Sequence, residues 1–565
     1  MKRPRAETWV VRVFFLLAFV VFTTVFPYIQ SINNPNENVR VFMTMSLVEK
    51  HTFVIDDIVA RHGWTNDMAK VPDPKGTGES HFFSVKAPAV SYAGVPFYWA
   101  FTKIAPRYGH PVPTVTSSAE DKTWWLHSSI LVMRLFTIQL PCFLFLVWLE
   151  RYLRTVSADV VLRLSAVAAA GLGTNYLAYA MMYASHSLFA CAAFASFAIT
   201  TQARARYPQA TDRKLSSAFW AGFFAGLATL LEYHALPVSV GLAVYALTTF
   251  FRPTRLVMFG VGGMIHALAL MFFQKRCFGS PFTPGHKFSE TEAFRTILST
   301  GVFGINAPKL EAFQGTTTNV GFGFFGTSPF MWLGLLAIPL VIFFRRPGTD
   351  PTGRLRRATI AWTSIMLLLF VTVSAAVNWR AGWAIGPRYL GAAPPFFAFG
   401  AVCALEQLAW KGGKKRLVVR SLAGGLAIAS VVQSGLVGLL YNTLPEAYTR
   451  PLTQFALPMM RTGFVPHHAG ELLGYPTATF WYVVAGCMGV AALVAALWRA
   501  RDRLHLWAVR IALTMGVFAL GIRPAMSKPK DDEMICTTGN HCDDLAWGQH
   551  FFPSIWEPAD RNRLT

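Results

Sequence analysis

The chain has 565 residues, of which 53% are hydrophobic and only 14% are charged. A composition this apolar excludes one or two water-soluble domains, because their cores could not bury so much apolar surface. The net charge of +22 does not indicate nucleic acid as a partner. The basic residues occur in short loops between apolar runs and do not form one face or patch.

Apolar runs of about 20 residues recur along the chain, and each is long enough to cross a bilayer as a helix. The first run follows Lys2, Arg3 and Arg5 without a small-residue cleavage site, which indicates an uncleaved span. We therefore predict an all-α polytopic membrane protein with about thirteen transmembrane helices. The expected spans are 9–29, 125–149, 157–177, 180–201, 215–231, 235–251, 256–274, 327–344, 358–377, 389–409, 418–440, 478–498 and 506–523.

Every second loop of this layout carries a cluster of arginine and lysine, which is the positive-inside pattern. It predicts a protein of the cytoplasmic (inner) membrane, with the N-terminus in the cytoplasm and the C-terminus outside. Counting the apolar stretch 87–105 as a span would place nearly every later cluster outside. We therefore expect an interfacial helix there, within a large first extracytoplasmic loop over 30–124.

Further long segments then lie outside, at 275–326, 442–477 and beyond Arg523, joined by the shorter loop 377–388. Loops longer than about 15 residues are uncommon unless they are functional or disordered. The chain divides into a transmembrane domain, 1–524, and an extracytoplasmic tail, 525–565. Within the tail, Cys536 and Cys542 are candidates for a disulfide. A metal site there, with His541 and His550 nearby, is the less favoured alternative.

The segment Asn34–Asp57 directly follows the first span. Its apolar residues recur at helical spacing, which predicts an amphipathic helix near 36–50 lying on the membrane. Glu37 and Arg40 lie on one face of that helix. A carboxylate there can act as a general base, and an arginine can bind a phosphate with two parallel hydrogen bonds. The alternative, which composition alone favours, is a helix-start acid that pairs with a nearby arginine.

Two other outer segments carry isolated cations. Lys86 precedes the stretch 87–105 and either reaches the lipid headgroups or neutralises a specific lipid phosphate. Arg388 follows Pro387 where the loop enters a span, with Trp379 and Trp383 nearby. It either anchors a helix end or faces a polar cavity.

Ionisable residues also occur inside the predicted spans or at their outer ends, where such groups are costly. They are Arg134, His186 and Glu232. Glu232 either lines a polar cavity or caps a helical turn, and His186 fits a packing role slightly better than a site. None of the three alone indicates a reaction.

The ordered set of motifs resembles the GT-C superfamily of membrane glycosyltransferases that use polyprenyl-phosphate sugars. This superfamily includes protein O-mannosyltransferases and the aminoarabinose transferase that acts on lipid A. The similarity covers residues from about 30 to 400: the acidic motif at Glu37, Lys86-Ala87-Pro88, the pattern of Gly173, Thr174, Tyr183 and His186, Phe278–Phe282, and Gly386–Tyr389.

The resemblance implies transfer of a sugar from a polyprenyl-phosphate carrier to an acceptor hydroxyl at the outer face of the cytoplasmic membrane. It implies Glu37 as the general base and Arg40, Lys86 and Arg388 as ligands of the donor phosphate. Many relatives have Asp-Glu at the acidic motif, where this chain has Asn36-Glu37. Either Glu37 has taken over the role of the base, or Asp56 or Asp57 approaches the site instead. Further candidates for the pocket are Arg134, Tyr183, His186, Glu232, Trp379 and Trp383.

The sequence leaves two other classes open. A transporter or lipid flippase would also have many spans, although no paired halves with interrupted helices are visible. A non-catalytic relative that scaffolds envelope assembly would explain the loss of the usual aspartate. The expected partners are the lipid-linked donor, membrane lipids and a lipid, glycan or protein acceptor. No cofactor is required by the sequence, although some members of the superfamily use a divalent cation.

Overall fold

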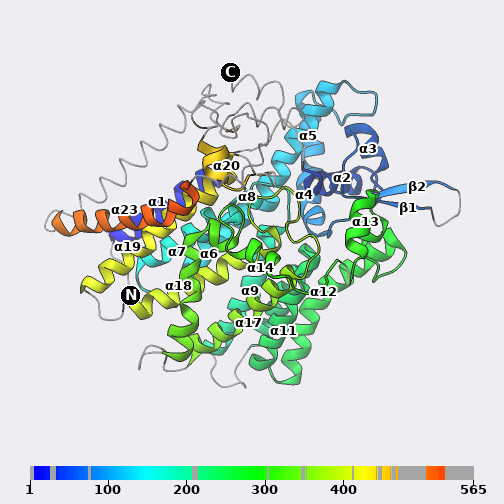
Figure 1. Cartoon of the computed structure of the whole chain (residues 1–565). Helices are drawn as coiled ribbons and strands as arrows, with labels where there is room; N and C mark the ends of the chain where they lie inside the picture. The colour runs from blue at the N-terminus through cyan, green and yellow to red at the C-terminus, as the bar shows by residue number, and fades with distance from the viewer. Residues whose placement is uncertain are drawn as a thin grey trace.

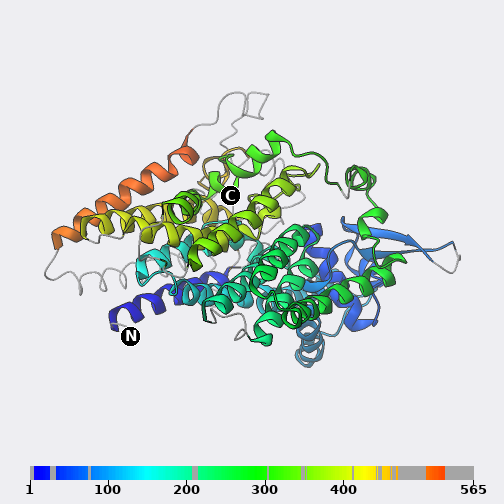
Figure 2. The same ribbon diagram turned by 90° about the horizontal axis from the view of Figure 1, so that it is seen from below.

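The computed structural model describes residues 5–25, 34–73, 78–206, 214–301, 304–344, 353–409, 413–440, 448–457 and 504–527, with a few single residues between them. Within these residues the fold is a bundle of helices with one small two-stranded sheet (Figures 1 and 2). Seven helical segments are long and apolar enough to cross a membrane: 7–24, 119–153, 186–205, 253–278, 354–374, 413–440 and 508–526. The chain is therefore an integral membrane protein.

The bundle contains these helices in chain order: α1 (Arg5–Thr24), α5 (Ala119–Arg134), η2 (Leu135–Gln139), α6 (Leu140–Leu153), α7 (Val160–Leu172), α8 (Asn175–Ala180), α9 (His186–Arg206), α10 (Leu215–Leu231), η4 (Tyr233–Ala235), α11 (Leu236–Thr249) and α12 (Pro253–Phe278). After them come η5 (Gly285–Phe288), α13 (Glu292–Ser299), α14 (Leu310–Thr317), α15 (Phe324–Thr327), η6 (Pro329–Met331), α16 (Trp332–Leu335), η7 (Ile338–Phe343), α17 (Arg354–Ser374), η8 (Arg388–Leu390), α18 (Ala393–Leu408), α19 (Gly413–Ser430), η9 (Val431–Gly435), α20 (Leu436–Leu440), η10 (Leu452–Ala456) and α23 (Leu504–Met526).

A helix lies at each predicted span that falls within the described residues. The predicted span 478–498, the tail beyond 527 and the cysteines Cys536 and Cys542 lie outside them. The total of about thirteen spans, the disulfide and the orientation of the termini therefore stay predictions. Cys142, Cys277 and Cys403 are buried and unpaired, as expected for small apolar residues.

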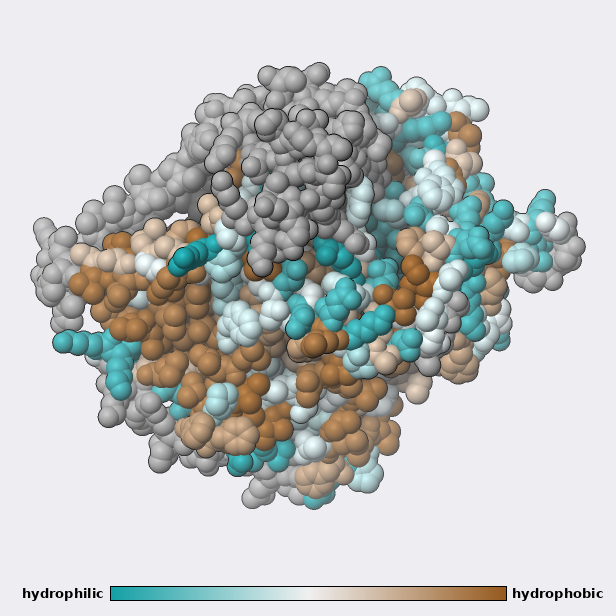
Figure 3. All heavy atoms as spheres, in the orientation of Figure 1, coloured by the Kyte–Doolittle hydropathy of each residue, from teal (hydrophilic) through white to brown (hydrophobic). Residues whose placement is uncertain are grey.

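The outer surface of the bundle is apolar where lipid would cover it. Figure 3 shows hydrophobic residues over α11, α19 and α23, whereas hydrophilic residues gather around α3 (Asp56–His62), α13 and the sheet. Large side chains of α12 that are mostly exposed include Val257, Met264 and Leu268, at 63%, 52% and 56%. In a bilayer the hydrocarbon chains replace water around such residues.

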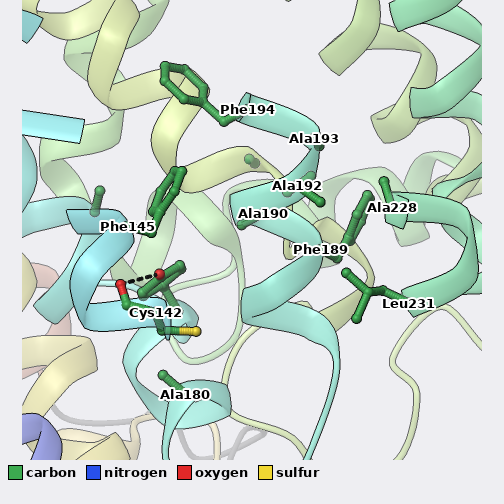
Figure 4. Close-up of a cluster of buried hydrophobic side chains, with 14 of the residues drawn as sticks. Cys142, Phe145, Ala180, Phe189, Ala190, Ala192, Ala193, Phe194, Ala228 and Leu231 are labelled. Carbon is green, nitrogen blue, oxygen red and sulfur yellow. Dashed lines mark hydrogen bonds between the residues drawn. The ribbon is translucent and has the colours of Figure 1, made fainter. Parts of the chain in front are cut away.

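The interior contains closely packed aromatic and small residues. Figure 4 shows Phe145 and Phe194 in a cluster of buried hydrophobic side chains that includes alanines of α9. The ring centroids of these two phenylalanines lie 6.2 Å apart in an edge-to-face arrangement, which aromatic pairs prefer. Tyr176 also donates a hydrogen bond to the Cys142 carbonyl, at 2.9 Å, so its buried hydroxyl is satisfied.

α10 and α12 pack closely because glycines face one another across the helix pair. A Cβ atom at Gly262 would lie 2.2 Å from the Phe219 carbonyl oxygen, whereas one at Gly260 would meet nothing within 4 Å. We predict that Gly262→Ala lowers stability by about 1–3 kcal/mol, because the backbone of α10 has to move. Gly260→Ala on the same helix is the control and should be close to neutral. Thermal unfolding of both variants in detergent tests this, and equal melting temperatures would contradict it.

The first loop contains two of the expected helices and one unexpected sheet. α2 (Pro35–Glu49) and α4 (Ala89–Ile104) lie at the predicted positions 36–50 and 87–105. Strands β1 (Met68–Pro72) and β2 (Ser80–Ser84) pair antiparallel, with Met68 opposite Ser84, so the loop is not wholly helical. α2 is also more buried than a helix lying on a membrane: Val39, Val41 and Met45 have no exposed surface, and α2 packs against α4 and β2.

A second loop docks onto this sheet. The Glu290 amide donates to the Met68 carbonyl at 2.9 Å, and Ser289 forms an isolated bridge with Ala69. The Trp64 indole donates to the Glu290 carboxylate at 2.7 Å. Residues 289–291 therefore tie the loop after α12 to both sides of Asp67. We call this contact the 289–291 clasp.

Candidate functional site

Glu37 is held at the start of α2 by the local sequence. Asn34 caps the helix with its side chain and Pro35 occupies the first turn, as is typical of helix starts. Arg134 donates from Nε to Oε1 of Glu37 at 2.5 Å and from Nη2 to Oε2 at 2.6 Å. The Tyr183 amide also donates to Oε1, at 2.6 Å. Both carboxylate oxygens are thus occupied, and the Glu37 and Arg134 side chains are 2% and 3% exposed.

This buried pair joins the first loop to the last turn of α5. Removing one partner of such a pair leaves an uncompensated buried charge, which costs about 3–5 kcal/mol. We predict that Glu37→Gln and Arg134→Met each destabilise the protein by about this amount, and that the double variant recovers part of the loss. Asp57→Asn is the control, because Asp57 pairs with Lys50 on the surface and is 65% exposed. A fully stable Glu37→Gln protein would contradict the prediction.

The second buried group surrounds Arg40, one turn further along α2. Arg40 is 1% exposed and donates to the Asn36 carbonyl and to the Ser185 hydroxyl, both at 2.7 Å. Its Nη2 lies 3.5 Å from Oε1 of Glu232, and Ser185 donates a short hydrogen bond to the same oxygen. Segments about 145 and 192 residues apart in the sequence meet here.

Two histidines lie beside Glu232. Nδ1 of His186 is 3.1 Å from Oε1, and Nε2 of His234 is 3.4 Å from Oε2. Neither contact has hydrogen-bonding geometry, because both ring nitrogens of His186 and Nε2 of His234 are buried without a partner among the described residues. His186 is at the first position of α9, and His234 belongs to the short turn η4.

A largely buried ion pair, Lys86 with Asp67, interacts electrostatically with this group. Nζ of Lys86 is 3.0 Å from Oδ2 of Asp67, and their side chains are 14% and 19% exposed. Asp67 has φ of +65°, a conformation that aspartate tolerates better than most residues. Lys86 also interacts electrostatically with Arg388 and Arg40. Three cations from separate segments therefore surround one carboxylate that is partly accessible.

The electrostatics keep Asp67 ionised. Burial acts to raise the pKa of Asp67, but the charge and hydrogen bond of Lys86 outweigh it, so the pKa lies below its usual value. Burial lowers the pKa of Lys86 despite the opposing effect of Asp67. Burial together with the charge of Lys86 lowers the pKa of the nearby His286 to about 4. At neutral pH His286 is therefore uncharged and Asp67 negative.

Arg388 reaches this region from the turn η8. The side chain of Asn175, at the start of α8, donates to the Pro387 carbonyl at 3.1 Å and fixes the turn. The Arg388 guanidinium lies 5.7 Å from the centroid of the Tyr389 ring, and it interacts electrostatically with Asp67 and Glu232. Its Nε is buried without a hydrogen-bond partner among the described residues, as is Nε of Arg40.

The structure brings together most of the predicted site residues, but in two groups. Glu37, Arg134 and Tyr183 form one group, and Arg40, His186, Glu232, Lys86 and Arg388 form the other. Asp56 lies elsewhere: it accepts a hydrogen bond from the Phe82 amide at 2.6 Å and contacts His81. Trp379 packs against Phe322, and Trp383 is 43% exposed.

Four residues of the second group were not singled out from the sequence: Asp67, Ser185, His234 and His286. His234 follows Glu232 by two residues. A carboxylate and an imidazole so close in the sequence could have been recognised as a pair of possible metal ligands. Asp67 was harder to recognise. Asn66 and Asp67 are typical turn residues, but the strand that follows them was not predicted. Ser185 and His286 carry no signal in the sequence alone.

No protein-family model matches the chain, and comparison with curated proteins finds no match. Six chains of solved structures are similar to it, among them two of ArnT and one of an oligosaccharyltransferase. ArnT from Cupriavidus metallidurans in the apo state has a TM-score of 0.45 and 15% identity over 92% of this chain and 77% of that one. The same protein bound to undecaprenyl phosphate has a TM-score of 0.43, with 16% identity over 92% and 76%.

The third is the Archaeoglobus fulgidus oligosaccharyltransferase in the apo form, with a TM-score of 0.41 and 12% identity over 80% of this chain. The chain spans 58% of the length of that enzyme.

Proposed function

We propose that the protein is a membrane glycosyltransferase that moves a sugar from a polyprenyl phosphate to an acceptor hydroxyl at the outer face of the membrane. The observation that supports this most is a set of unsatisfied donors. Nε of Arg40 and Nε of Arg388 are buried without partners among the described residues, and buried polar groups are rarely left in that state. Phosphate oxygens would satisfy both donors.

The charge of the site also suits a phosphate. Arg40, Lys86 and Arg388 contribute three positive charges, and Asp67 and Glu232 contribute two negative ones, so one positive charge remains when the histidines are neutral. A lipid-linked phosphodiester carries one negative charge and gains a second as the sugar leaves. Cations held in place beforehand stabilise this developing charge, and a donor anchored in the bilayer loses less entropy on reaction.

We assign the general base to Asp67. The acceptor oxygen attacks the anomeric carbon, the bond from that carbon to the phosphate oxygen breaks with its electron pair moving to the phosphate, and the hydroxyl proton passes to the Asp67 carboxylate. Asp67 is ionised, partly accessible and beside the three cations, whereas both oxygens of Glu37 already accept hydrogen bonds. Glu37, Asp56 and Asp57 stay predictions for the same role.

The proposal is tested by mass spectrometry of envelope lipids, glycans and proteins from cells with and without the intact gene. We expect a sugar-sized mass increment on one class of molecule to disappear on deletion and to return with the wild-type gene but not with Arg388→Gln. Unchanged glycosylation, together with purified protein that carries a labelled lipid across vesicles without forming a glycoside, would support a flippase instead.

A further inference from the structure

His186, Glu232 and His234 are arranged as metal ligands. One ligand atom from each of the three residues lies within 4.8 Å of the others. Nδ1 of His186 lies 3.1 Å from Oε1 of Glu232 and Nε2 of His234 lies 3.4 Å from Oε2, so the two histidines face opposite oxygens of one carboxylate, each at a distance close to that between two ligands of one metal ion. With metal bonds of about 2.0–2.1 Å, neighbouring ligands lie roughly 3.3 Å apart.

The second observation is the state of the histidine nitrogens. His186 and Glu232 have 3% and 7% exposed side chains, so water does not satisfy them freely. A buried imidazole beside a carboxylate ordinarily donates a hydrogen bond to it, yet these nitrogens have no hydrogen-bond partner among the described residues. Nitrogen lone pairs that converge on a carboxylate without such a bond are suited to a shared cation.

We propose that His186, Glu232 and His234 bind one transition-metal ion, with zinc as the best match. Two imidazoles and a carboxylate favour zinc and its neighbours over magnesium or calcium, which prefer all-oxygen sites. Three protein ligands leave a fourth position for water or an anion, as in catalytic zinc sites. Ser185 and Arg40, which contact Glu232, orient the carboxylate from outside the ligand set.

The neighbouring cations set the conditions for binding. Arg40 and Arg388 repel a divalent ion, so an anion in the fourth position should tighten its binding. His234, with 29% of its side chain exposed, is the most accessible of the three ligands. The inference deepens the proposed function, because the ion would lie beside the donor phosphate, but metal binding can be measured without any transfer assay.

The full chain, purified in detergent, is incubated with Zn²⁺ in the presence and absence of inorganic phosphate, desalted and analysed for metal content. We expect about one ion per chain, more tightly held with phosphate, and loss of that ion in His234→Gln and Glu232→Gln. His266→Gln is the matched control, because His266 is also a buried histidine with an unpartnered Nε2, and this variant should bind as the wild type does.

If a variant fails to fold, the wild-type protein loaded with Co²⁺ provides a second test of the site. An intense visible spectrum of tetrahedral cobalt with nitrogen and oxygen ligands is expected. Its absence, or metal content in the wild type no higher than in a folded His234→Gln protein, would overturn the site. Loss of metal with intact glycosylation in cells would refute a role in transfer but leave the metal site standing.

Discussion

Asp67→Asn should abolish most sugar transfer while the protein stays folded. General bases contribute about 10²–10⁴-fold to such reactions, and asparagine keeps the shape of the side chain but cannot accept the proton. The rate constant for transfer should fall by this factor at saturating donor, because the phosphate-binding cations remain. Initial rates with the purified protein in vesicles, using the donor and acceptor identified by mass spectrometry, measure the effect.

Asp121→Asn provides the control for this variant. Asp121 is an exposed aspartate at the start of α5, next to its capping residue Ser118, and its substitution should leave the rate unchanged. Wild-type rates in Asp67→Asn would remove Asp67 from the mechanism. The folded variants Glu37→Gln, Asp56→Asn and Asp57→Asn are then compared. If one of them loses activity instead, the general base is the carboxylate that was replaced.

Arg388→Gln should lower kcat/KM by about 10²–10³-fold, the effect of removing one preorganised group that stabilises developing charge. The unpartnered Nε and the positive charge of Arg388 are both lost. Arg388→Lys should retain part of the activity, because lysine restores the charge but not the forked geometry. Steady-state kinetics together with competition by the free polyprenyl phosphate separate weaker donor binding from slower chemistry.

Arg380→Gln is the matched control for Arg388. Arg380 belongs to the same loop and stacks on Phe322, 4.9 Å from the ring centroid. If Arg380→Gln reduced turnover as much as Arg388→Gln, the loss would reflect the positive charge of the loop as a whole. The assignment of Arg388 to the donor phosphate would then fail.

The sequence predicted the helices well because a span has a strong and local signal. α10 occupies the expected range 215–231, and α12, at Pro253–Phe278, covers the expected span 256–274. The hairpin β1–β2 was missed, because its five-residue strands are short and do not alternate clearly between polar and apolar residues. The burial of α2 was missed for another reason: its partners α4 and β2 follow much later in the chain.

The site was predicted in part. Cations that are costly in a membrane protein stand out in the sequence, so Arg40, Lys86 and Arg388 were named. Their partners depend on long-range contacts: Glu37 and Arg40 are three residues apart, yet one meets Arg134 and the other Ser185. Spacing on one helix could not show that these neighbours serve two separate groups. The sequence could not show the role of Asp67 at all, because Asp67 meets Lys86 only through the pairing of β1 with β2.

The 289–291 clasp fixes the position of Asp67 from outside the group of buried site residues. Glu290 and Ser289 hold the residues directly after Asp67, and Thr291 contacts Asn66 directly before it. A binder that reaches only these loops would act on Asp67 without contacting the buried Arg40 and Arg388. An antibody fragment raised against the clasp should therefore act as an inhibitor that does not compete with the lipid donor.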